Sequence, residues 1–366
     1  MILLILQTTG IVTLIAGVLA IILVIAERYL ADYGECTIDI NGKKKEIVKG
    51  GSSLLSSLNE KKIYLASACG GRGSCGFCKC KVLSGGGPLL PTEKPFLTAA
   101  EIADNVRLSC QVKVKEDIKI EIPEDIFNIR KFKAVVEKIV DYTYDIKELT
   151  LRINEPDTIS FKAGQYIQLH SKKYAKVKHS VSRAYSISSN PENPQIVQVI
   201  IRKVTEGICT TWVHEHISEG EEIEFTGPFG DFFIQDTDAD MLFIAGGSGK
   251  APIKSMVEYL DQKKSNRRMV YFFGARAVKD LYLTEYFHEF ENTLADFTYV
   301  PVLSQPDESD NWQGRQGYIT KYLAEFVKDC ANTEAYLCGS PAMINAMVKG
   351  LHACGIKEEN IYYDSF

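Results

Sequence analysis

The sequence predicts a multidomain protein: a single N-terminal transmembrane helix, a small α+β domain, an antiparallel β-barrel and an α/β domain with a parallel sheet. An uncharged apolar run begins the chain, short alternating strands dominate its middle, and its last third repeats a buried strand followed by a glycine turn and a helix. The expected domain boundaries are 1–28, 34–123, 131–234 and 236–366.

Length and composition fit a globular protein of several domains. The 366 residues leave room for about two to four domains, and 45% apolar with 24% charged residues argues against disorder. The net charge is −5 and the pI is near 5.8, and no basic stripe is interleaved with aromatic residues. These features argue against a nucleic-acid-binding surface, so we expect no nucleic acid among the partners.

The first 28 residues predict a membrane anchor. There is no charged side chain between Ile2 and Ala26, and about 20 apolar residues are enough to span a bilayer. A cleaved signal peptide is the alternative, but it needs a positively charged start, a shorter apolar core and a small-residue cleavage site. Arg28 and Lys43 to Lys45 follow the run, so the positive-inside rule places the rest of the chain in the cytoplasm. The lipid bilayer is therefore an expected partner.

Residues 34–123 predict a small β-rich domain. The dipeptide Asn41-Gly42, between two strand-like segments, supplies the positive φ values of a type I′ hairpin turn. A helix is expected from Ser53 to about Glu60. The other expected elements are strands over 79–83, 106–114 and 118–122 and a helix over 98–103.

Four cysteines of this domain are spaced like the ligands of an iron–sulfur cluster. Cys69, Cys75 and Cys78 lie in a glycine-rich loop, and Cys110 follows much later in the chain. Four thiolates hold a 2Fe-2S centre in proteins with a Cys-x4-Cys-x2-Cys run and one distant cysteine; here the first gap is one residue longer. The intervening glycines allow tight turns that aim backbone N–H groups at sulfur. The spacing therefore predicts a 2Fe-2S site.

Two alternatives compete with a cluster. A zinc site usually has two Cys-x2-Cys pairs or a mixture of cysteine and histidine, whereas this region has a single pair and no nearby histidine. A disulfide framework is disfavoured because only ten cysteines are spread over 366 residues. Cys80 would face the same way as Cys78 in an alternating strand, and we leave it out of the ligand set.

Residues 131–234 contain groups suited to a flavin. In Arg183-Ala184-Tyr185-Ser186 the arginine can pair with a phosphate, the aromatic ring can stack on a flat ring, and the hydroxyl can hydrogen-bond a ring nitrogen. Alone, this string also fits an ordinary strand with one exposed arginine. Gly207 and Thr210 open a helix-like stretch that presents N–H groups to an anion, and residues 227–230 (Gly-Pro-Phe-Gly) are expected to turn the chain. Together the three signals favour a flavin site.

Residues 236–366 predict an α/β nucleotide domain. A buried strand over 241–245 leads into Gly246-Gly247-Ser248-Gly249 and then a helix. A pyrophosphate can rest on the backbone N–H groups of such a loop, although the Gly-x-Gly-x-x-Gly form is missing. Two more strands end at Arg276 and at Cys338-Gly339. Three loops therefore lie along one carboxyl edge, where open α/β sheets bind ligands.

The order of these motifs resembles the ferredoxin-NADP reductase superfamily fused to a 2Fe-2S domain. With the N-terminal helix, it is similar to the family of the F subunit of sodium-translocating NADH:quinone reductase. The cysteine loop, Arg-Ala-Tyr-Ser, Gly-Pro-Phe-Gly and Cys-Gly-Ser-Pro carry the resemblance, which covers nearly all of the chain. It implies a β-grasp ferredoxin-type domain, an FAD-binding β-barrel and an NADH-binding α/β domain.

The resemblance implies roles for residues around the cluster and the flavin. Arg183 would bind an FAD phosphate, Tyr185 would pack on the isoalloxazine and Ser186 would lie near its reactive N5. Gly207 and Thr210 would hold the pyrophosphate of FAD. The cluster ligands would be Cys69, Cys75, Cys78 and Cys110.

Further roles are implied for the nucleotide domain. Gly247 to Gly249 and Arg276 would meet the dinucleotide, and Cys338 would approach the nicotinamide. Phe366 would cover the flavin until nicotinamide displaces it, or else pack on a neighbouring strand. Lys250 departs from the pattern, since members of the superfamily often carry an apolar residue there.

Together these features imply an NADH dehydrogenase in which a hydride passes from NADH to FAD and single electrons pass through the cluster to a membrane or quinone-linked acceptor. We expect NADH rather than NADPH, membrane-protein redox partners, and a single-pass location in a bacterial cytoplasmic membrane with the C-terminal domains in the cytoplasm. One alternative is a reductase component that supplies an oxygenase or another enzyme. Another is a tethered ferredoxin carrier whose C-terminal domains only dock a partner.

Overall fold

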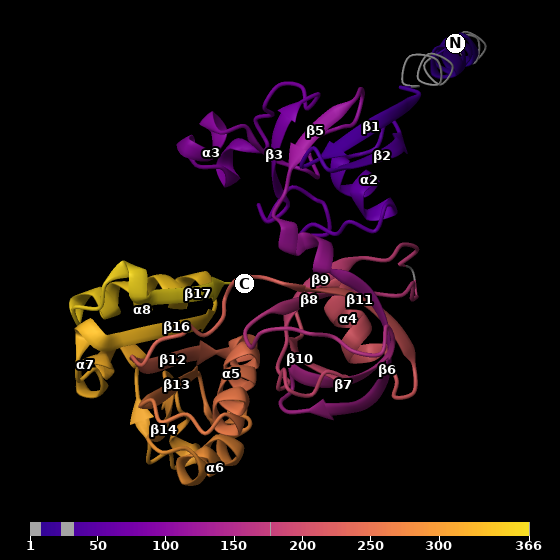
Figure 1. Ribbon diagram of the computed structural model, residues 1–366. Coiled ribbons are helices and arrows are strands. Elements are labelled where there is room, and N and C mark those ends of the chain that lie inside the picture. The colour runs from indigo at the N-terminus through magenta and orange to yellow at the C-terminus, as the bar shows by residue number, and fades with distance from the viewer. Residues whose placement is uncertain (1–8, 23–32, 176, 366) are drawn as a thin grey trace. The chain divides into compact units, whose positions relative to one another are not determined.

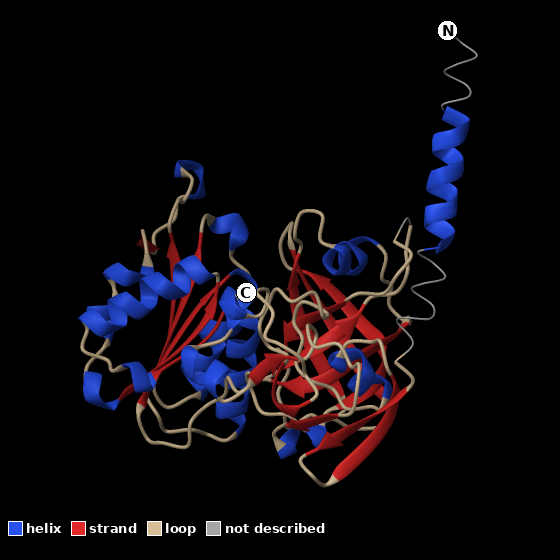
Figure 2. Ribbon diagram, turned by 90° about the horizontal axis from the view of Figure 1, so that it is seen from above, coloured by secondary structure: helices blue, strands red, loops and turns tan. Residues whose placement is uncertain are grey.

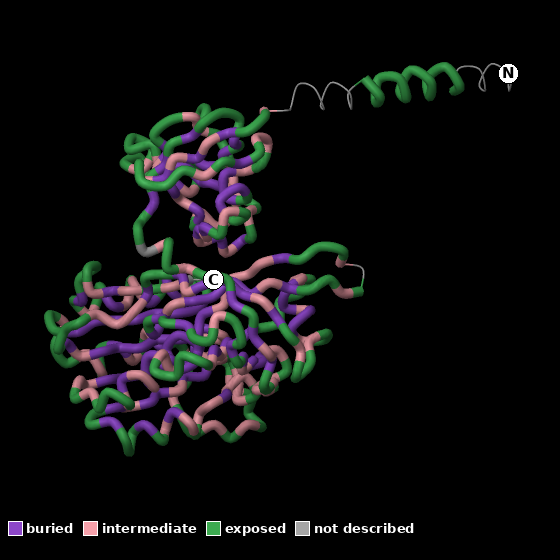
Figure 3. The backbone as a smooth tube through the Cα atoms, turned by 45° about the vertical axis from the view of Figure 1, so that its right-hand side comes forward, coloured by how far each residue is buried: buried purple, intermediate pink, exposed green. Residues whose placement is uncertain are grey.

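The structure is a computed structural model that describes residues 9–22, 33–175 and 177–365, and the chain divides into two compact units, Met1–Asn128 and Ile129–Phe366 (Figure 1). Residues 9–22 are helical, and all of them are exposed (Figure 3). No helix in the described part of the chain is long and apolar enough to cross a membrane. The rest of the expected anchor, 1–28, lies outside the described residues, as does Phe366.

The first unit is built on a five-stranded sheet in the order β2-β1-β5-β3-β4. Its elements are β1 (Glu35–Ile40), β2 (Lys44–Lys49), α2 (Leu54–Glu60), β3 (Lys79–Ser84), α3 (Ala99–Ala103), β4 (Val106–Leu108) and β5 (Ile118–Glu121). The hairpin prediction is confirmed, because β1 and β2 pair antiparallel across Asn41 and Gly42, whose φ values are 56° and 65°. Apolar residues of the sheet and α2, including Ile38 and Leu54, form the core.

The predicted strand over 106–114 is wrong in length. β4 ends at Leu108, and the chain then turns, with the N–H of Gln111 donating to the carbonyl of Leu108 at 2.8 Å. Apolar alternation continues through Val112 and Val114 because both side chains still reach the core. The turn that follows Leu108 contains Cys110 and ends the strand.

The second unit begins with a six-stranded antiparallel sheet in the order β10-β7-β6-β11-β8-β9. Ile187, just after β9, bridges to Val199 of β10, so the two edges of the sheet meet as in a barrel. Trp212 and Val213 of α4 are buried in its core. The elements are β6 (Arg130–Asp141), β7 (Ile146–Glu155), β8 (Tyr166–His170), β9 (Ser182–Ser186), β10 (Ile196–Arg202), α4 (Ile208–Glu215) and β11 (Glu222–Phe229).

The Gly-Pro-Phe-Gly segment does not turn the chain as expected. Gly227 pairs with Arg130 of β6, and Phe229 pairs with Tyr166 of β8, so the segment is the end of β11. The register shifts between Thr226 and Phe229, as in a β-bulge. The rings of Phe229 and Tyr166 stack with centroids 5.5 Å apart, which favours the extended path.

The third domain is a parallel sheet in the order β15-β14-β13-β12-β16-β17, as expected for an α/β fold. Helices cover both faces (Figure 2): α5 and α6 pack with Phe243, and α7 and α8 pack with Ile244. The elements are β12 (Asp240–Gly246), the short helix η3 (Gly247–Gly249), α5 (Lys250–Gln262), β13 (Met269–Ala275), α6 (Thr284–Thr293), β14 (Phe297–Leu303), β15 (Arg315–Gln316), α7 (Leu323–Phe326), β16 (Thr333–Gly339), α8 (Pro341–Ala353) and β17 (Ile361–Ser365).

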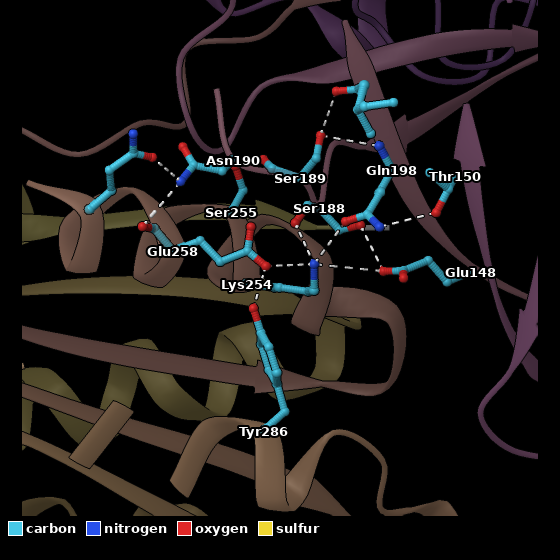
Figure 4. A network of polar contacts seen from close by, with 12 residues as sticks. Glu148, Thr150, Ser188, Ser189, Asn190, Gln198, Lys254, Ser255, Glu258 and Tyr286 are labelled. Carbon is cyan, nitrogen blue, oxygen red and sulfur yellow. Dashed lines mark hydrogen bonds and ion pairs between the residues drawn. The ribbon is translucent and has the colours of Figure 1, made fainter. Parts of the chain in front are cut away.

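Helix α5 joins the α/β domain to the barrel through a buried polar network (Figure 4). The Lys254 ammonium lies 2.7 Å from Glu258 and 3.9 Å from Glu148 of β7, and it donates to the Ser188 carbonyl at 3.2 Å and to Gln198 at 3.0 Å. The side chains of Lys254 and Glu148 are 6% and 5% exposed, so both charges are removed from water. This network, called the α5 network below, fixes the barrel against the helix that follows the glycine loop.

Candidate redox-cofactor sites

The cysteine loop is wound by glycines in left-handed conformations. Gly73 and Gly76 have φ values of 73° and 74°. A Cβ atom on Gly73 would lie 2.5 Å from the side-chain nitrogen of Gln111, and one on Gly76 would lie 3.0 Å from Phe96. A larger residue at either position would push the loop off its neighbours. The glycines thus set the path that brings the cysteines together.

Hydrogen bonds divide the four thiols into two pairs. The side chains of Cys69 and Cys75 hydrogen-bond each other, as do those of Cys78 and Cys110. Within the described residues, no group of three or more histidine, cysteine or acidic side chains surrounds a single metal-ion position. Four-cysteine coordination of two irons calls for two thiolates on each, so this donor set fits a 2Fe-2S cluster.

Each pair favours one thiolate. Burial raises the pKa of Cys69, but hydrogen bonds from Ser74, Cys75 and Arg72 outweigh it and lower the pKa to about 7. The hydrogen bond from Cys78 lowers the pKa of Cys110 to about 6 and raises the pKa of Cys78 itself. Iron binds the thiolate form of cysteine, so the hydrogen bonds that lower the pKa of Cys69 and Cys110 favour the form that can act as a ligand.

Cys80 has a different environment. It lies in β3 and is 4% exposed, and burial raises its pKa to about 12. A thiol in such apolar surroundings stays protonated at neutral pH.

A buried ion pair that sequence reasoning missed supports the strand before Cys110. The Arg107 guanidinium contacts both carboxylate oxygens of Glu93, at 2.7 to 3.2 Å, and it donates to the carbonyls of Gly86, Gly87 and Pro88. Glu93 also accepts from the N–H of Leu108 at 2.9 Å. Because hydrogen bonds satisfy both members of the pair, the two charges are tolerated in the core. Glu93 and Arg107 lie 14 residues apart in the sequence, so no short sequence pattern predicts that they pair.

The Arg-Ala-Tyr-Ser string forms β9, paired antiparallel with β8. Arg183 and Tyr185 share one face of the strand, because side chains alternate. Arg183 is half-buried and donates to the carbonyl of Ser182 at 2.6 Å, while Ser186 is buried. The Tyr185 hydroxyl hydrogen-bonds Cys209 in the first turn of α4, and burial raises the pKa of Tyr185 well above its usual value. This contact brings the string and the start of α4 together.

The segment before α4 is held by the Thr210 hydroxyl. It accepts from the N–H of Val204 at 3.2 Å and lies 3.2 Å from the carbonyl of Gly207, the N-cap residue of α4. A Cβ atom on Gly207 would lie 2.4 Å from that hydroxyl. The first-turn N–H groups of α4 therefore lie near an arginine and an aromatic ring, a combination that fits a flavin with its phosphates.

The glycine loop of the α/β domain packs directly on β16. Gly247 has a φ of 58°, and a Cβ atom on Gly249 would lie 2.1 Å from the carbonyl oxygen of Cys338. Gly246 also lies beside Gly274 of β13 in the parallel register, and exposed Arg276 follows that strand. The structure thus brings the three predicted loops to one edge, where backbone N–H groups can meet a pyrophosphate.

The Cys338 side chain lies below that edge. It is 0% exposed, and burial raises its pKa well above the usual range. In the described structure its thiol faces the core shared with Phe243 and Tyr271 rather than solvent.

Arg202, at the end of β10, is a basic residue at this loop that sequence reasoning missed. A Cβ atom on Gly247 would lie 3.7 Å from its Nη1, and its Nε donates to Asp145 at 2.8 Å. The barrel therefore places a guanidinium beside the glycine loop, where it can attract an anion. Its position depends on how two domains pack, which the local sequence does not reveal.

Family comparisons agree with this division of sites. Residues 38–115 match the 2Fe-2S iron-sulfur cluster binding domain, 133–234 the oxidoreductase FAD-binding domain, and 243–349 the oxidoreductase NAD-binding domain. The expected cofactors, a 2Fe-2S cluster, FAD and NAD(H), are therefore confirmed, as is the multidomain fold that carries them.

Similar solved structures include the Amycolatopsis cytochrome P450 reductase GcoB, with a TM-score of 0.73 and 26% identity, covering 90% of this chain and 98% of that one. The ferredoxin reductase in carbazole 1,9a-dioxygenase has a TM-score of 0.69 at 24% identity, covering 91% of this chain and 98% of that one, which shows a shared fold.

Relatives match the chain from end to end. The F subunit of the Na(+)-translocating NADH-quinone reductase of Pseudomonas aeruginosa strain UCBPP-PA14 is 36% identical, with 96% of each chain covered. The protein of that name from Marinomonas sp. strain MWYL1 is also 36% identical, with 98% of each chain covered. The expected resemblance is confirmed: this chain belongs to the family of the F subunit of Na(+)-translocating NADH-quinone reductase.

Proposed function

We propose that this chain is the NADH-oxidising subunit of a membrane redox complex, which passes electrons to a quinone-linked acceptor. The observation that carries the proposal is the presence, in one chain, of two thiol pairs, a flavin site and a nucleotide loop. When bound, FAD would supply two-electron hydride acceptance and one-electron release, and a 2Fe-2S cluster would supply one-electron transfer. The relatives' name supports the quinone and the coupling to Na(+).

The residues divide between the cofactors by chemistry. Cys69 and Cys75 would hold one iron, and Cys78 and Cys110 would hold the other. In the flavin domain, Arg183 would pair with a phosphate, Tyr185 would pack on the flat ring and Ser186 would hydrogen-bond its N5 edge. Gly207 and Thr210 would shape the turn that offers the N–H groups of α4 to the pyrophosphate of FAD.

The nucleotide site would lie at the carboxyl edge of the parallel sheet. Gly246 to Gly249 would bind the NADH pyrophosphate with Arg276 and Arg202 beside it, and the backbone at Cys338-Gly339 would border the nicotinamide. Phe366 would cover the flavin before nicotinamide enters. Together these residues would hold the nicotinamide against the flavin and exclude water during hydride transfer.

The exposed helix over 9–22 supports a membrane anchor. Its large apolar side chains are about half exposed or more, for example Ile11 at 59% and Leu14 at 70%. It lies inside the uncharged run from Ile2 to Ala26, and burial in lipid would remove this apolar surface from water. We place the protein in a bacterial cytoplasmic membrane as a single-pass chain, with its cofactor domains in the cytoplasm.

Anaerobic addition of NADH to the detergent-purified protein tests the proposal. We expect bleaching of the flavin and cluster absorbance, with a faster rate for NADH than for NADPH. Unchanged spectra would refute NADH oxidation. Copurification of multi-span membrane subunits would support the complex, whereas a soluble oxygenase as partner would favour the second candidate function, which the likeness to a cytochrome P450 reductase supports.

A further inference from the structure

Lys250, the first residue of α5, is a lysine buried without a counter-ion. Its side chain is 0% exposed, and within the described residues it makes no ion pair. Its Nζ donates to the carbonyl of Tyr282 at 2.6 Å and to the hydroxyl of Tyr299 at 3.0 Å. Burial lowers the pKa of Lys250 well below its usual value. An isolated charge is costly to bury, so a buried lysine directly after the glycine loop calls for an explanation.

Four aromatic rings enclose the Lys250 nitrogen. Ring centroids lie 3.6 Å away for Phe273 of β13, 4.7 Å for Tyr282, 4.9 Å for Phe287 of α6 and 5.2 Å for Tyr299 of β14. Aromatic faces attract a cation, so these four rings, called the aromatic box below, can hold an ammonium group when a nearby negative charge favours the protonated form.

The titratable groups around the box are few. Tyr282 and Tyr299 touch Lys250 itself. Behind them, Tyr271 lies near Tyr299 and the thiol of Cys338, while α6 places His288 and Glu291 against Tyr299, and the barrel places Tyr142, Asp145 and Glu148 near Tyr282. In the part of the chain that the structure describes, none of these carboxylates forms an ion pair with Lys250, so no fixed anion in direct contact stabilises its charged form.

Lys250 is linked to the glycine loop through its backbone and through its side chain. Its backbone N–H donates to the carbonyl of Gly247, and the same carbonyl accepts from the Tyr282 hydroxyl at 2.8 Å. The Lys250 side chain in turn holds the backbone of Tyr282. Moving the lysine would therefore shift Tyr282 and the left-handed turn at Gly247 together.

We propose that Lys250 is a positioning residue for the dinucleotide pyrophosphate: it fixes the glycine loop through Tyr282 and takes up one proton as the pyrophosphate binds. The inference rests on the proposed function, in which Gly247 to Gly249 hold that group. The proton comes from solvent, converts the amine to an ammonium and leaves when the nucleotide leaves. The physical cause is the negative charge of the pyrophosphate, which favours the charged form of a nearby lysine.

Calorimetric titration of the full-length, cofactor-loaded protein tests this inference. NAD(+) and ADP-ribose are titrated at one pH in two buffers of different ionisation enthalpy. We expect the binding enthalpy of the wild type to depend on the buffer, with a slope that corresponds to the uptake of up to one proton per nucleotide. Lys250→Met should abolish the buffer dependence and weaken binding about tenfold, the factor that corresponds to one pKa unit of coupling.

Two further variants sharpen the result. Lys263→Met removes an exposed lysine at the other end of α5 and should keep the wild-type uptake. Tyr282→Phe should keep the uptake and weaken binding about threefold to tenfold, because one hydrogen bond to Gly247 is lost. If Lys250→Met does not fold, Lys250→Gln replaces it, since a neutral amide can still donate a hydrogen bond but takes up no proton.

The outcomes separate the two proposals. Wild-type protein that binds neither nucleotide would refute the proposed function. Wild-type binding without buffer dependence, or uptake that persists in Lys250→Met, would refute the role of Lys250 alone. In steady-state assays, the role of Lys250 predicts a raised KM for NADH at nearly unchanged kcat.

Discussion

Cys110 and Cys80 are both cysteines near one end of the first sheet, and their surroundings assign them opposite properties. Cys110 accepts a hydrogen bond from Cys78, which lowers its pKa to about 6, whereas burial raises the pKa of Cys80 to about 12. The surroundings of each cysteine, and not its position in the sequence, therefore determine which side chain becomes a thiolate.

Cys110→Ala should lose the 2Fe-2S spectrum while NADH still bleaches the flavin. The reason is that one iron would keep a single protein thiolate, whereas the flavin site lies in another domain. Visible absorbance and electron paramagnetic resonance measure the cluster, and stopped-flow absorbance at the flavin band measures its reduction. Cys80→Ala is the matched control and should retain the cluster; a Cys110→Ala protein with a normal cluster would contradict the ligand assignment.

Lys250→Met should raise the thermal unfolding midpoint at neutral pH. The pKa of Lys250 is lowered in the folded state, so the unfolded chain binds more protons between the folded pKa and the ordinary lysine value of about 10.4. The destabilisation by Lys250 is full below the folded pKa and fades as the pH rises toward the ordinary value. Unfolding measured without nucleotide at pH 7 and pH 10 should show the gain shrinking; a gain that grows with pH would contradict this sign.

At the scale of elements, α5 connects two domains through charges that are largely removed from water. Lys254 is the shared cation of the α5 network, between Glu148 on the barrel and Glu258 on its own helix (Figure 4). Lys254 also donates hydrogen bonds to the Ser188 carbonyl and to the Gln198 side chain. Lys254 is therefore the charged centre of a domain contact that also includes the hydrogen bond from Ser255 to the Ser189 carbonyl.

Lys254→Ala should destabilise the second unit by about 3–5 kcal/mol, because it leaves the buried Glu148 and the partly buried Glu258 without a cation. Denaturant unfolding followed by flavin fluorescence measures the change. Lys263→Ala, which removes an exposed partner of Glu192 on the same helix, should leave the transition almost unchanged. Equal transitions for the two variants would show that the network contributes little.

Elements with a strong local signal were predictable from the sequence. The Asn41-Gly42 hairpin and the repeated strand, glycine turn and helix were confirmed. The strand over 106–114 and the turn at Gly-Pro-Phe-Gly were wrong, because tertiary contacts override short apolar patterns.

The same limit applies to the sites. The four cysteines can be predicted because their spacing in the sequence is typical of cluster ligands, and the structure brings them into pairs. Arg202, Lys254 and the Glu93–Arg107 pair act between segments that only folding brings together. No pattern within a short window could have identified their partners.

At the scale of the whole molecule, each compact unit has its own apolar core. Residues 129–366 expressed alone should therefore fold, bind FAD and reduce ferricyanide with NADH, while lacking the cluster and failing to reduce a quinone. Flavin content and assays with the two acceptors check this expectation. The full chain is the control, and quinone reduction by the fragment at the full-chain rate would contradict the order of carriers.

Lys250 and Lys254 are separated by one helical turn of α5, the first held in the aromatic box and the second by the barrel. A single-residue insertion or deletion between them would rotate one about 100° relative to the other, since a helix has 3.6 residues per turn. Neither the loop ahead of the helix nor the barrel could follow such a rotation. The length of this one turn is therefore a constraint on any engineered or natural variant: substitutions can be accommodated there, but changes in length cannot.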